Sequence, residues 1–568
     1  MSALRPRELL AGRRLLITGA SGFLGKVWLA HLLEELPETE LVLLLRPARG
    51  RGSLQERAEA RLRELLETSP AFRGVHERLG AAELARRVRA RVRAVAGDVG
   101  APELGAELGG PLDLIVHLAG LTDLDPPLDQ ALAVNVDGAL AALELARRAG
   151  AQLVHVSTAY VAGRRRGLVP EAVLAGAPDA PAGASFDAAR ERRELGALLE
   201  ATRREADDPR VRGELHTRAE AARRRLGLTP GELPRLLARE REAWVEARAA
   251  GEARARAKAW GWPNLYTETK ALAEVLLARA REGVPLTVVR PTIVEAALRD
   301  PFPGWKEGLH TSAPLTYALT HGPLRALPAR EDLVLDVVPV DAVARGLTLA
   351  CAAALDDPPA TPRVLHLGSS ARNPFPVRRV IELTALEHRR ATAETRGPFR
   401  AGELLRLDAA ASSEALYRAQ VPLARRLLRG GERLLARAAE RLGDGTLGER
   451  LREGARQARA AARGFEAVEE AVERFRPFVL EHDQVFQGDA VEALSARLDL
   501  RADAAFRWDV GELRWERYWP EVHLPGLRRW VYPRIEGKRV PEEPRRPLPS
   551  ELPQEQDQAQ DQVLPRSG

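Results

Sequence analysis

The sequence has little of what marks secreted or membrane-spanning proteins. Its one cysteine, Cys351, lies in the apolar run LTLACAAAL, so we expect a buried thiol, no intrachain disulfide and no thiolate metal cluster. No stretch approaches the ~20 uninterrupted apolar residues that a bilayer span needs, and the opening MSALRPRELLAGRR has no apolar signal core. We therefore expect a soluble, unexported, cytoplasmic protein without a metal site.

The sequence also lacks a block of charge of one sign. Its 86 lysines and arginines stand against 80 aspartates and glutamates, a formal net charge of +6. The basic residues are spread among acidic ones along helix-like segments. A nucleic-acid-binding surface is therefore not expected.

Short apolar runs alternate with helix-like segments through the first part of the chain. Candidates for buried strands are residues 13–18, 41–45, 92–98, 114–120, 153–158 and 286–292. Strands that alternate with helices in this way form a parallel sheet with right-handed crossovers. The predicted fold class is therefore α/β, with a doubly wound, parallel Rossmann-type sheet.

Charged, alanine-rich segments with helical periodicity interrupt this alternation and follow it. Residues 164–259 have the character of a helical insertion in a loop after a strand, where such loops shape substrate pockets. We assign residues 1–375 to the sheet-containing domain with this insertion, and 376–536 to a mainly helical C-terminal domain. From 537 to 568 large apolar residues vanish, which predicts a disordered tail.

The segment FRWDVGELRWERYWPEVHLPGLRRWVYP near the C-terminus is rich in aromatic residues. Contact with a membrane surface through these rings is one interpretation, and ordinary packing is the other. We favour packing of the four tryptophans in this segment, which are Trp508, Trp515, Trp519 and Trp530.

A glycine-rich turn, TGASGFLG, lies between the first strand candidate and a helix. Glycines at these spacings let the chain turn tightly and bring backbone amides against a pyrophosphate, and the helix N-terminus favours the anion. Because the turn follows the first strand of an alternating pattern, we predict a dinucleotide site. The predicted contacts are Thr18, Gly19, Ser21, Gly22, Phe23, Leu24 and Gly25.

Arginines follow the second strand candidate, where an acidic residue would bind the ribose of NAD. Arg46 comes directly after Leu45, with Arg49 and Arg51 nearby. The planar fork of an arginine can pair with a 2′-phosphate, so the predicted cofactor is NADPH.

Residues at later strand ends are expected to complete the cofactor site. A carboxylate after the third candidate can bind the adenine amine, two small residues after the fourth let the cofactor pass close to the backbone, and three residues near 291 can line the nicotinamide pocket. For the carboxylate and the last three, a plain strand-end turn is the alternative. In chain order these residues are Asp98 with Val99, Ala119 with Gly120, and Pro291, Thr292 and Ile293.

A tyrosine and a lysine four residues apart are the main catalytic candidates. Tyr266 and Lys270 in NLYTETKALAEVLL share one face of a predicted helix, so the ammonium can lower the pKa of the phenol and hold the nicotinamide ribose. Thr158 in HVSTAYVAG ends an upstream strand and can hydrogen-bond the same substrate oxygen, with Ser157 as the alternative. These residues predict a hydride-transfer site.

This constellation resembles the extended short-chain dehydrogenase/reductase superfamily. Within it, the chain is most similar to the alcohol-forming fatty acyl-CoA reductases and to the related thioester reductase domains, over about residues 12–370. The segment PTIV…PFPGW is the most discriminating, because sugar epimerases share the glycine turn and the YxxxK pattern. The motifs that carry the resemblance are TGASGFLGKVWLAHLL, LLLRP, VAGDV, VHLAG, VNVDG, VHVSTAYVAG, LYTETKALAE, VVRPTIV, PFPGWKEG and VVPVDAVARG.

The resemblance implies reduction of a long-chain fatty acyl-CoA, with acyl-carrier protein as an alternative donor. Hydride would go to the thioester carbonyl while Tyr266 and Thr158 stabilise the oxyanion, and a second reduction of a retained aldehyde would give the alcohol. Asp341 in VVPVDAVARG is expected to cap a helix. The long insertion departs from the family pattern, so the acyl-binding surface does not carry over residue by residue.

Three other functions compete with this interpretation. The first is a reductase that stops at the aldehyde, and the second is a nucleotide-sugar epimerase or dehydratase, which the PFPGW segment and the arginines after Leu45 disfavour. The third is a scaffold that binds NADPH without turnover, which has no need of a proton donor.

Overall fold

A parallel sheet forms the centre of the molecule. The computed structural model describes residues 3–101, 108–179, 185–309, 311–321, 326–396, 410–443 and 445–549. Within them, the central sheet has seven strands in the order β11-β7-β5-β4-β1-β2-β3, all paired in parallel. The strands are β1 (Arg14–Thr18), β2 (Glu40–Leu45), β3 (Val92–Ala96), β4 (Leu114–His117), β5 (Gln152–Val156), β7 (Leu286–Pro291) and β11 (Arg363–Leu367). The predicted parallel sheet is confirmed, and β11 is a strand that the sequence analysis did not identify.

Alternate residues along each strand pack on opposite faces of the sheet. On one face Leu15 and Ile17 join a core with α2 (Phe23–Glu35) and α12 (Val340–Asp356). On the other face, Leu16 joins a second core with α6 (Gly138–Ala149) and α10 (Leu265–Ala280). The sheet is therefore doubly wound, as predicted.

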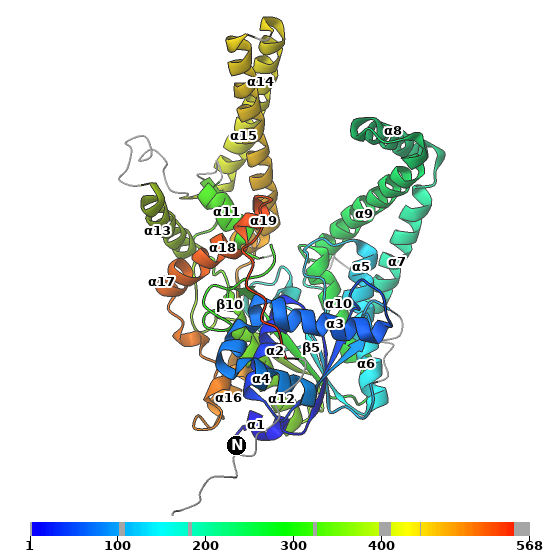
Figure 1. Cartoon of the computed structure of the whole chain (residues 1–568), viewed down its shortest axis with the longest axis vertical. Coiled ribbons are helices and arrows are strands. Elements are labelled where there is room, and N and C mark those ends of the chain that lie inside the picture. Colours follow the sequence, from blue (N-terminus) through cyan, green and yellow to red (C-terminus); the bar gives the residue numbers. More distant parts are fainter. Residues whose placement is uncertain are drawn as a thin grey trace, which may run out of the picture.

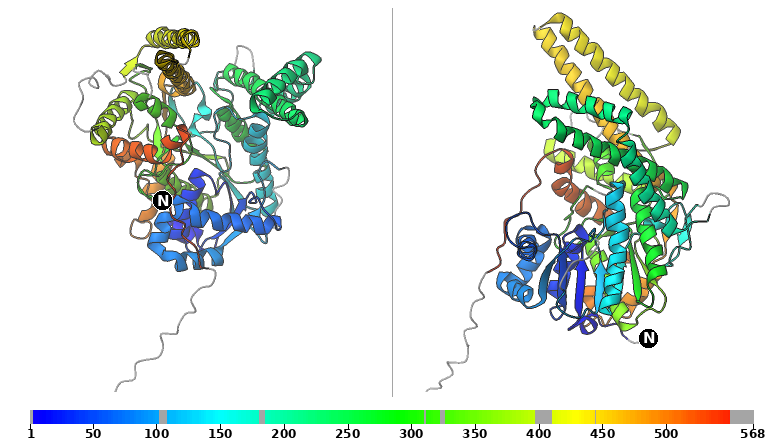
Figure 2. Two further views of the ribbon diagram at one scale, coloured as in Figure 1. Left: turned by 45° about the horizontal axis from the view of Figure 1, so that its top comes forward. Right: turned by 90° about the vertical axis from the view of Figure 1, so that its right-hand side faces the viewer.

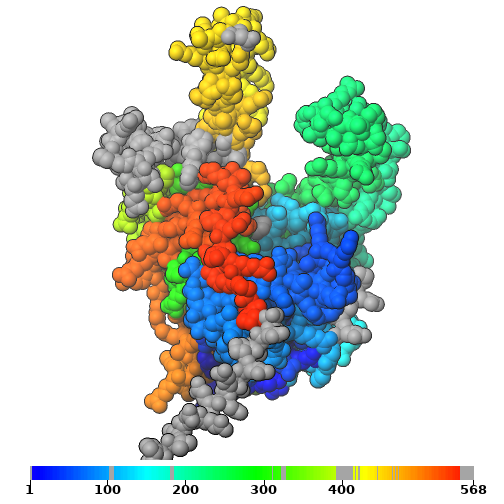
Figure 3. Space-filling model, in the orientation of Figure 1, coloured from blue at the N-terminus to red at the C-terminus, as the bar shows by residue number. Residues whose placement is uncertain are grey.

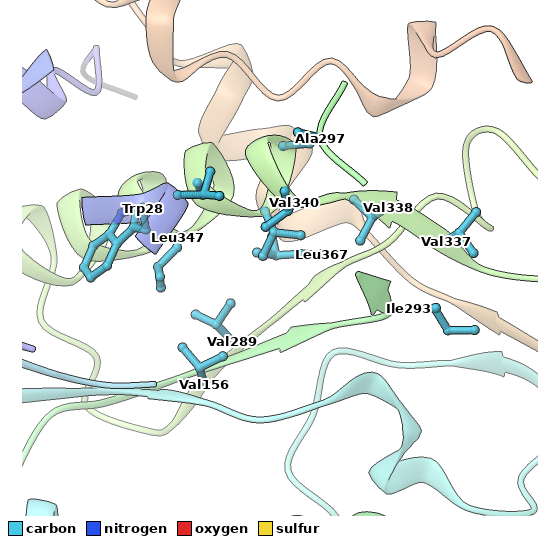
Figure 4. Close-up of a cluster of buried hydrophobic side chains, with 14 of the residues drawn as sticks. Trp28, Val156, Val289, Ile293, Ala297, Val337, Val338, Val340, Leu347 and Leu367 are labelled. Carbon is cyan, nitrogen blue, oxygen red and sulfur yellow. The ribbon is translucent and has the colours of Figure 1, made fainter. Parts of the chain in front are cut away.

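Figure 4 shows part of the first core. Trp28 of α2 and Leu347 of α12 lie over Val156 of β5 and Val289 of β7. The indole nitrogen of Trp28 also donates a hydrogen bond to the hydroxyl of Thr348, 3.0 Å away. This satisfied, fully buried tryptophan fixes α2, and with it the turn between β1 and α2.

Further helices and three short strand pairs surround the sheet. In the N-terminal half of the chain, these helices are α1 (Pro6–Leu10), α3 (Leu54–Thr68), η1 (Pro70–Phe72), α4 (Arg73–Arg91, broken at Gly80), α5 (Leu128–Ala131), η2 (Leu132–Asp137) and η3 (Ala159–Ala162). Three small parallel ladders lie outside it: β8 (Ile293–Glu295) with β10 (Val337–Pro339), β9 (Ala326–Pro328) with β12 (Ala410–Ser412), and β6 (Gly167–Val169) with β13 (Gln484–Phe486).

The predicted helical insertion forms a projecting arm after β5. It contains α7 (Ala188–Glu205), α8 (Pro209–Leu226), η4 (Pro230–Glu232) and α9 (Leu233–Ala259), drawn in green in Figure 1. The bases of α7 and α9 share a hydrophobic cluster with α10. The insertion is thus attached to the helix that carries Tyr266 and Lys270.

The C-terminal region is mainly helical and adds a second arm. α13 (Val377–Arg396) precedes a helical hairpin of α14 (Glu414–Leu442) and α15 (Thr446–Arg476), which projects from the body (Figures 1 and 2). The remaining elements are α11 (Ala313–His321), η5 (Pro477–Glu481), α16 (Asp489–Ala496), η6 (Ala504–Phe506), η7 (Val510–Glu512), α17 (Trp515–Arg517), η8 (Tyr518–His523), α18 (Leu524–Trp530) and α19 (Tyr532–Ile535).

The chain after the hairpin returns to the body of the molecule. Phe375 stacks on Trp515 with ring centroids 4.4 Å apart, across the domain boundary placed at residue 375. That boundary stays a prediction. All four tryptophans of the aromatic segment are at most 7% exposed, so the preference for ordinary packing is confirmed.

The predicted tail is described only in part. Residues 538–549 have neither helix nor strand, and Arg545 and the amide of Leu548 bind the carboxylate of Glu67. Residues 550–568 lie outside the described residues, and disorder of the tail stays a prediction. Cys351 is fully buried, as expected. Among the described helices, none combines the length and the apolar character needed to cross a bilayer.

Candidate functional site

The fold brings the predicted site residues to one edge of the sheet. β1, β4, β5 and β7 lie side by side in the sheet and all run in the same direction. Their carboxyl ends are followed by the glycine turn, by Gly120, by Thr158 and by Thr292 respectively. In open α/β sheets this is the edge where ligands bind.

The glycine turn needs its glycines for steric reasons. Gly19 has φ +76°, and a Cβ there would lie 2.6 Å from the backbone nitrogen of Ala119, two residues after the neighbouring strand β4. A Cβ on Gly25 would overlap the carbonyl oxygen of Gly19. Helix α2 begins at Phe23, and its N-cap residue Gly22 offers no side chain to its first amides. These amides are left to bind an anion such as a pyrophosphate.

The Gly25→Ala variant should lose stability. The added methyl must push the turn away from α2, and overpacking of this kind costs about 1–3 kcal/mol. We expect a lower melting temperature and weaker binding of the dinucleotide, measured by thermal unfolding with and without NADPH. The control is Gly196→Ala in α7, where a Cβ meets nothing within 4 Å. That variant should gain up to about 1 kcal/mol from helix propensity, and equal losses in both variants would contradict this account.

The residues predicted for the adenosine half of the cofactor lie at the same edge of the sheet, at the ends of the outer strands β2 and β3. Arg46 directly follows β2, is exposed, and has no hydrogen-bond or ion-pair partner within the described part of the chain. Asp98 follows β3 and is also exposed, but its carboxylate accepts a hydrogen bond from the amide of Gly100 at 3.0 Å. Asp98 thus closes a turn, with Val99 partly buried beside it. An arginine without a partner is free to bind a phosphate.

Thr158 and Tyr266 meet, although 108 positions separate them in the sequence. The threonine hydroxyl lies near enough to the phenol to act on its pKa, which it lowers. The hydroxyl of Thr158 accepts a hydrogen bond from the backbone amide of Tyr160 at 3.3 Å and lies 3.5 Å from the carbonyl oxygen of Pro291. The threonine is 4% exposed. The fold therefore brings the predicted phenol and threonine hydroxyl together, and their joint action on a substrate oxygen stays a prediction.

Lys270 lies one helical turn from Tyr266 in α10 and points to the same edge. Its Nζ donates to the carbonyl oxygen of Val156, the last residue of β5, at 2.7 Å. The same nitrogen is 3.7 Å from where a Cβ on Gly120 would lie. The small residues Ala119 and Gly120 therefore leave room for the lysine head between two strand ends.

Burial sets the pKa values of both groups. Burial raises the pKa of Tyr266 to about 12, and the opposing contribution comes from Thr158. The expectation that the Lys270 ammonium lowers the pKa of this phenol is therefore wrong, because burial outweighs any such effect. Burial lowers the pKa of Lys270 to about 8, opposed by the negative charge of Glu274. A phenol with so high a pKa is protonated at neutral pH and can serve as a proton donor.

The three residues at the end of β7 are buried beside Thr158. Thr292 binds the carbonyl oxygen of Leu367 through its amide at 3.1 Å, and the amide of Ile293 binds Asp336. Pro291 presents its carbonyl oxygen to Thr158. These contacts place the predicted residues at the site, and contact of each with a nicotinamide stays a prediction.

Sequence reasoning missed Asn135, which ties the site together. Its amide oxygen accepts from the nitrogen of Leu121 at 2.8 Å, and its amide nitrogen lies 3.1 Å from the hydroxyl of Thr269, next to Lys270. It lies in η2, a short π-helix, an irregularity that is frequent at functional sites. The motif VNVDG contains this residue, but only the fold shows what it touches.

Sequence reasoning also missed a buried lysine beside the glycine turn. Lys306 of the PFPGWKEG segment lies 4.6 Å from the ring centroid of Phe23 and 3.2 Å from the carboxylate of Glu295. The expectation that Asp341 caps a helix is wrong. Its carboxylate instead binds the amides of Leu298 and Arg299, at 2.8 and 3.2 Å, so it fixes the loop that leads to PFPGW.

Taken together, the edge residues fit a dinucleotide. The glycine turn leaves space where side chains would collide, the first amides of α2 lack a side-chain cap, and Arg46 lacks a partner in the described chain. The hydroxyl of Ser157 is buried without a hydrogen-bond partner among the described residues. Donors and a cation without partners among the described residues thus lie at the carboxyl edge of the sheet, between β2 and β5.

The chain is similar to several known proteins. A family model described as male sterility protein matches residues 17–347, more than half of the chain. The chain is 28% identical over 540 residues to probable fatty acyl-CoA reductase 4 of Arabidopsis thaliana, which covers 92% of this chain and 98% of that protein. It is 28% identical over 379 residues to the alcohol-forming fatty acyl-CoA reductase of Simmondsia chinensis, covering 65% of this chain and 69% of that one. A similar solved structure is the terminal R domain from the myxalamid PKS-NRPS biosynthetic pathway, with a TM-score of 0.48 and 16% identity over 94% of this chain and 93% of that chain.

Proposed function

This chain belongs to the male sterility protein family and is a homologue of fatty acyl-CoA reductases, and from that premise we propose that it reduces long-chain fatty acyl-CoA to fatty alcohol with NADPH. It is an oxidoreductase with a nicotinamide cofactor. The observation that carries the finer proposal is the meeting of Tyr266 with Thr158 beside Lys270 at the carboxyl edge of the sheet.

Arg46 supports the choice of NADPH over NADH. It is exposed at the end of β2 and has no partner within the described residues. Its guanidinium can take the 2′-phosphate as a bidentate ligand. The glycine turn and the N-terminus of α2 would hold the pyrophosphate.

The chain's own residues would stabilise the oxyanion and position the substrate. The nicotinamide, when bound, supplies the hydride that reduces the carbonyl carbon. Tyr266 donates its phenolic proton to the carbonyl oxygen as negative charge develops there, and the Thr158 hydroxyl gives a second hydrogen bond. Lys270 holds the ribose and keeps a positive charge near the phenol. Loss of coenzyme A from the resulting hemithioacetal gives an aldehyde, and a second reduction of the retained aldehyde gives the alcohol.

Product analysis tests this function. Purified protein is mixed with NADPH and palmitoyl-CoA, NADPH oxidation is followed by absorbance, and the lipid product is identified by gas chromatography. We expect two NADPH consumed per hexadecanol formed. One NADPH per aldehyde would support an aldehyde-forming reductase, and no oxidation at all would support a binding-only protein.

Activity should fall as the pH rises through about 8. Because burial lowers the pKa of Lys270 to about 8, its ammonium is present below that pH and is lost above it. The proposed role needs the charge, so kcat/KM should decline above about pH 8 while Tyr266, with a pKa of about 12, stays protonated. In Lys270→Arg the guanidinium stays charged, and whatever activity remains should lose this decline. A wild-type profile that is flat up to about pH 9.5 would contradict the assignment.

A further inference from the structure

The helical hairpin of α14 and α15 exposes leucines in a way that the rest of the described surface does not. Four of the exposed leucines lie on α14 and a fifth opens α15, and their side chains are between 53% and 68% exposed. They are Leu423, Leu427, Leu434, Leu442 and Leu447. Scattered single leucines on a surface need no explanation, but a cluster on one element does.

Helical spacing gathers three of these leucines on one face. Leu427 follows Leu423 by four residues and precedes Leu434 by seven, so all three lie within a narrow stripe of the helix. Leu442 and Leu447 flank the turn at the tip of the hairpin. The apolar stripe thus runs about 16 Å along α14, at 1.5 Å per residue, and continues towards the tip.

Arginines without partners border this stripe. Four arginines of α14 are exposed, and their side chains form no hydrogen bond or ion pair with any described residue. They are Arg426, Arg433, Arg437 and Arg441. At 100° per residue they lie beside the leucines on the same side of α14. We call the three leucines and these four arginines the hairpin face.

Other arginines of the hairpin do have partners. Arg425 and Arg429 of α14 pair with Glu469 and Glu466 of α15, and Arg459 of α15 pairs with Glu432 at 2.8 Å. These pairs hold the two helices together. The arginines of the hairpin face are therefore not needed for the hairpin itself.

The distal hairpin carries an excess of positive charge. Residues 423–463 contain eleven arginines against five acidic residues, a net charge of +6, equal to that of the whole chain. Figure 3 shows the hairpin, in yellow, standing clear of the body with its sides open to solvent. The three leucines of the hairpin face are 55% to 68% exposed, so no other described segment covers them.

We propose that the hairpin face docks on the surface of an anionic lipid bilayer. A leucine stripe bordered by arginines buries its apolar side chains at the level of the headgroups, while the guanidinium groups reach the lipid phosphates. The composition argues against a protein partner as the occupant. Residues 423–463 contain no aromatic residue, whereas protein interfaces are enriched in tyrosine and tryptophan and leucine is rare among their hot spots.

Vesicle sedimentation tests the proposal with the full chain. The probes are vesicles of phosphatidylcholine alone and of equal parts phosphatidylcholine and phosphatidylglycerol. We expect the protein to sediment with the anionic vesicles and far less with the neutral ones, and high salt should weaken binding.

Two hairpin variants separate the apolar and the charged contributions. Leu427→Gln with Leu434→Gln, and Arg433→Gln with Arg437→Gln, should each weaken binding to anionic vesicles at least about tenfold. The control is Leu500→Gln with Arg501→Gln, an exposed pair close to Leu498, which bridges Leu4 near the N-terminus, at the end of the molecule away from the hairpin (Figure 1). It should bind vesicles as the wild type does.

Other results would overturn the proposal. The proposal is wrong if the wild type does not bind anionic vesicles. It is also wrong if both hairpin variants bind these vesicles as tightly as the wild type while their circular dichroism spectra are unchanged. Self-association in light scattering that the leucine variant abolishes would instead assign the face to a second copy of this chain. Turnover of a water-soluble, short-chain acyl-CoA without vesicles should be unchanged in all variants. Loss of vesicle binding can therefore be told apart from a failure of the proposed enzymatic function.

Discussion

Replacing Tyr266 with phenylalanine is expected to lower kcat at least about 10²-fold, with little change in the affinity for NADPH. The variant keeps the ring and its packing, but it removes the proton donor and its interaction with Thr158. Because the donor acts on charge that develops only during the reaction, the loss should fall on kcat. Steady-state kinetics with palmitoyl-CoA and a fluorescence titration with NADPH measure the two effects separately.

Tyr160 provides a matched control for this experiment. It is buried at the same edge of the sheet, two residues after Thr158, but its hydroxyl lies 3.4 Å from the carbonyl oxygen of Asp336. Tyr160→Phe should therefore change kcat by less than about threefold. Near-normal turnover of Tyr266→Phe, or an equal loss in Tyr160→Phe, would refute the assignment of the proton donor.

Replacing Arg46 with glutamate should shift the cofactor preference on the order of 10²-fold towards NADH. The substitution removes a charge-assisted hydrogen bond to the 2′-phosphate and adds a carboxylate that repels it. We expect kcat/KM for NADPH to fall steeply, while that for NADH changes little. Parallel assays with the two cofactors at the same acyl-CoA concentration give the ratio.

Arg148→Glu is the control for a general effect of charge. Arg148 is 64% exposed in the last turn of α6, before β5 begins, and so lies at the opposite edge of the sheet. It should leave the ratio of the two cofactors unchanged. Equal losses with NADPH and NADH in Arg46→Glu would mean that the phosphate binds elsewhere.

The sequence was sufficient to predict the sheet because its strands are continuous apolar runs with a physical signature. Six strand candidates match observed strands to within a few residues at their ends, since buried parallel strands need apolar side chains on both faces. β11 (RVLHL) was missed although it matches β5 (QLVHV) in length and in its buried histidine, His366, so neither feature sets it apart in the sequence. Only the fold shows it as the edge strand that pairs with β7. The ladder of β6 and β13 was missed because each strand has three residues and the paired residues Gly167 and Gln484 are 317 positions apart.

Residues of the candidate site could be predicted where their role depends only on local geometry, such as a turn or the spacing along one helix. Gly19 and Gly25 follow from the sterics of a turn, and Tyr266 and Lys270 follow from the spacing of a helix. Residues whose role depends on distant partners were not predictable. Asn135 acquires its role only when η2 lies against α10.

Residues distant in the sequence also determine which charged side chains are paired and which are exposed. Lys306 and Arg46 are both cations near the predicted cofactor path, and the sequence does not distinguish them. The fold buries Lys306 against Glu295 and leaves Arg46 exposed. In the same way, helical periodicity predicted α14 but not that one of its faces stays open to solvent.

Transfer of deuterium from the cofactor to the product tests the central claim most directly. Palmitoyl-CoA is incubated with the protein and with NADPH that carries deuterium at the transferred position of C4, and the product is examined by mass spectrometry. The account predicts hexadecanol with two deuterium atoms on its first carbon, and almost no product from Tyr266→Phe. Unlabelled product, or equal labelled product from the wild type and the variant, would contradict it.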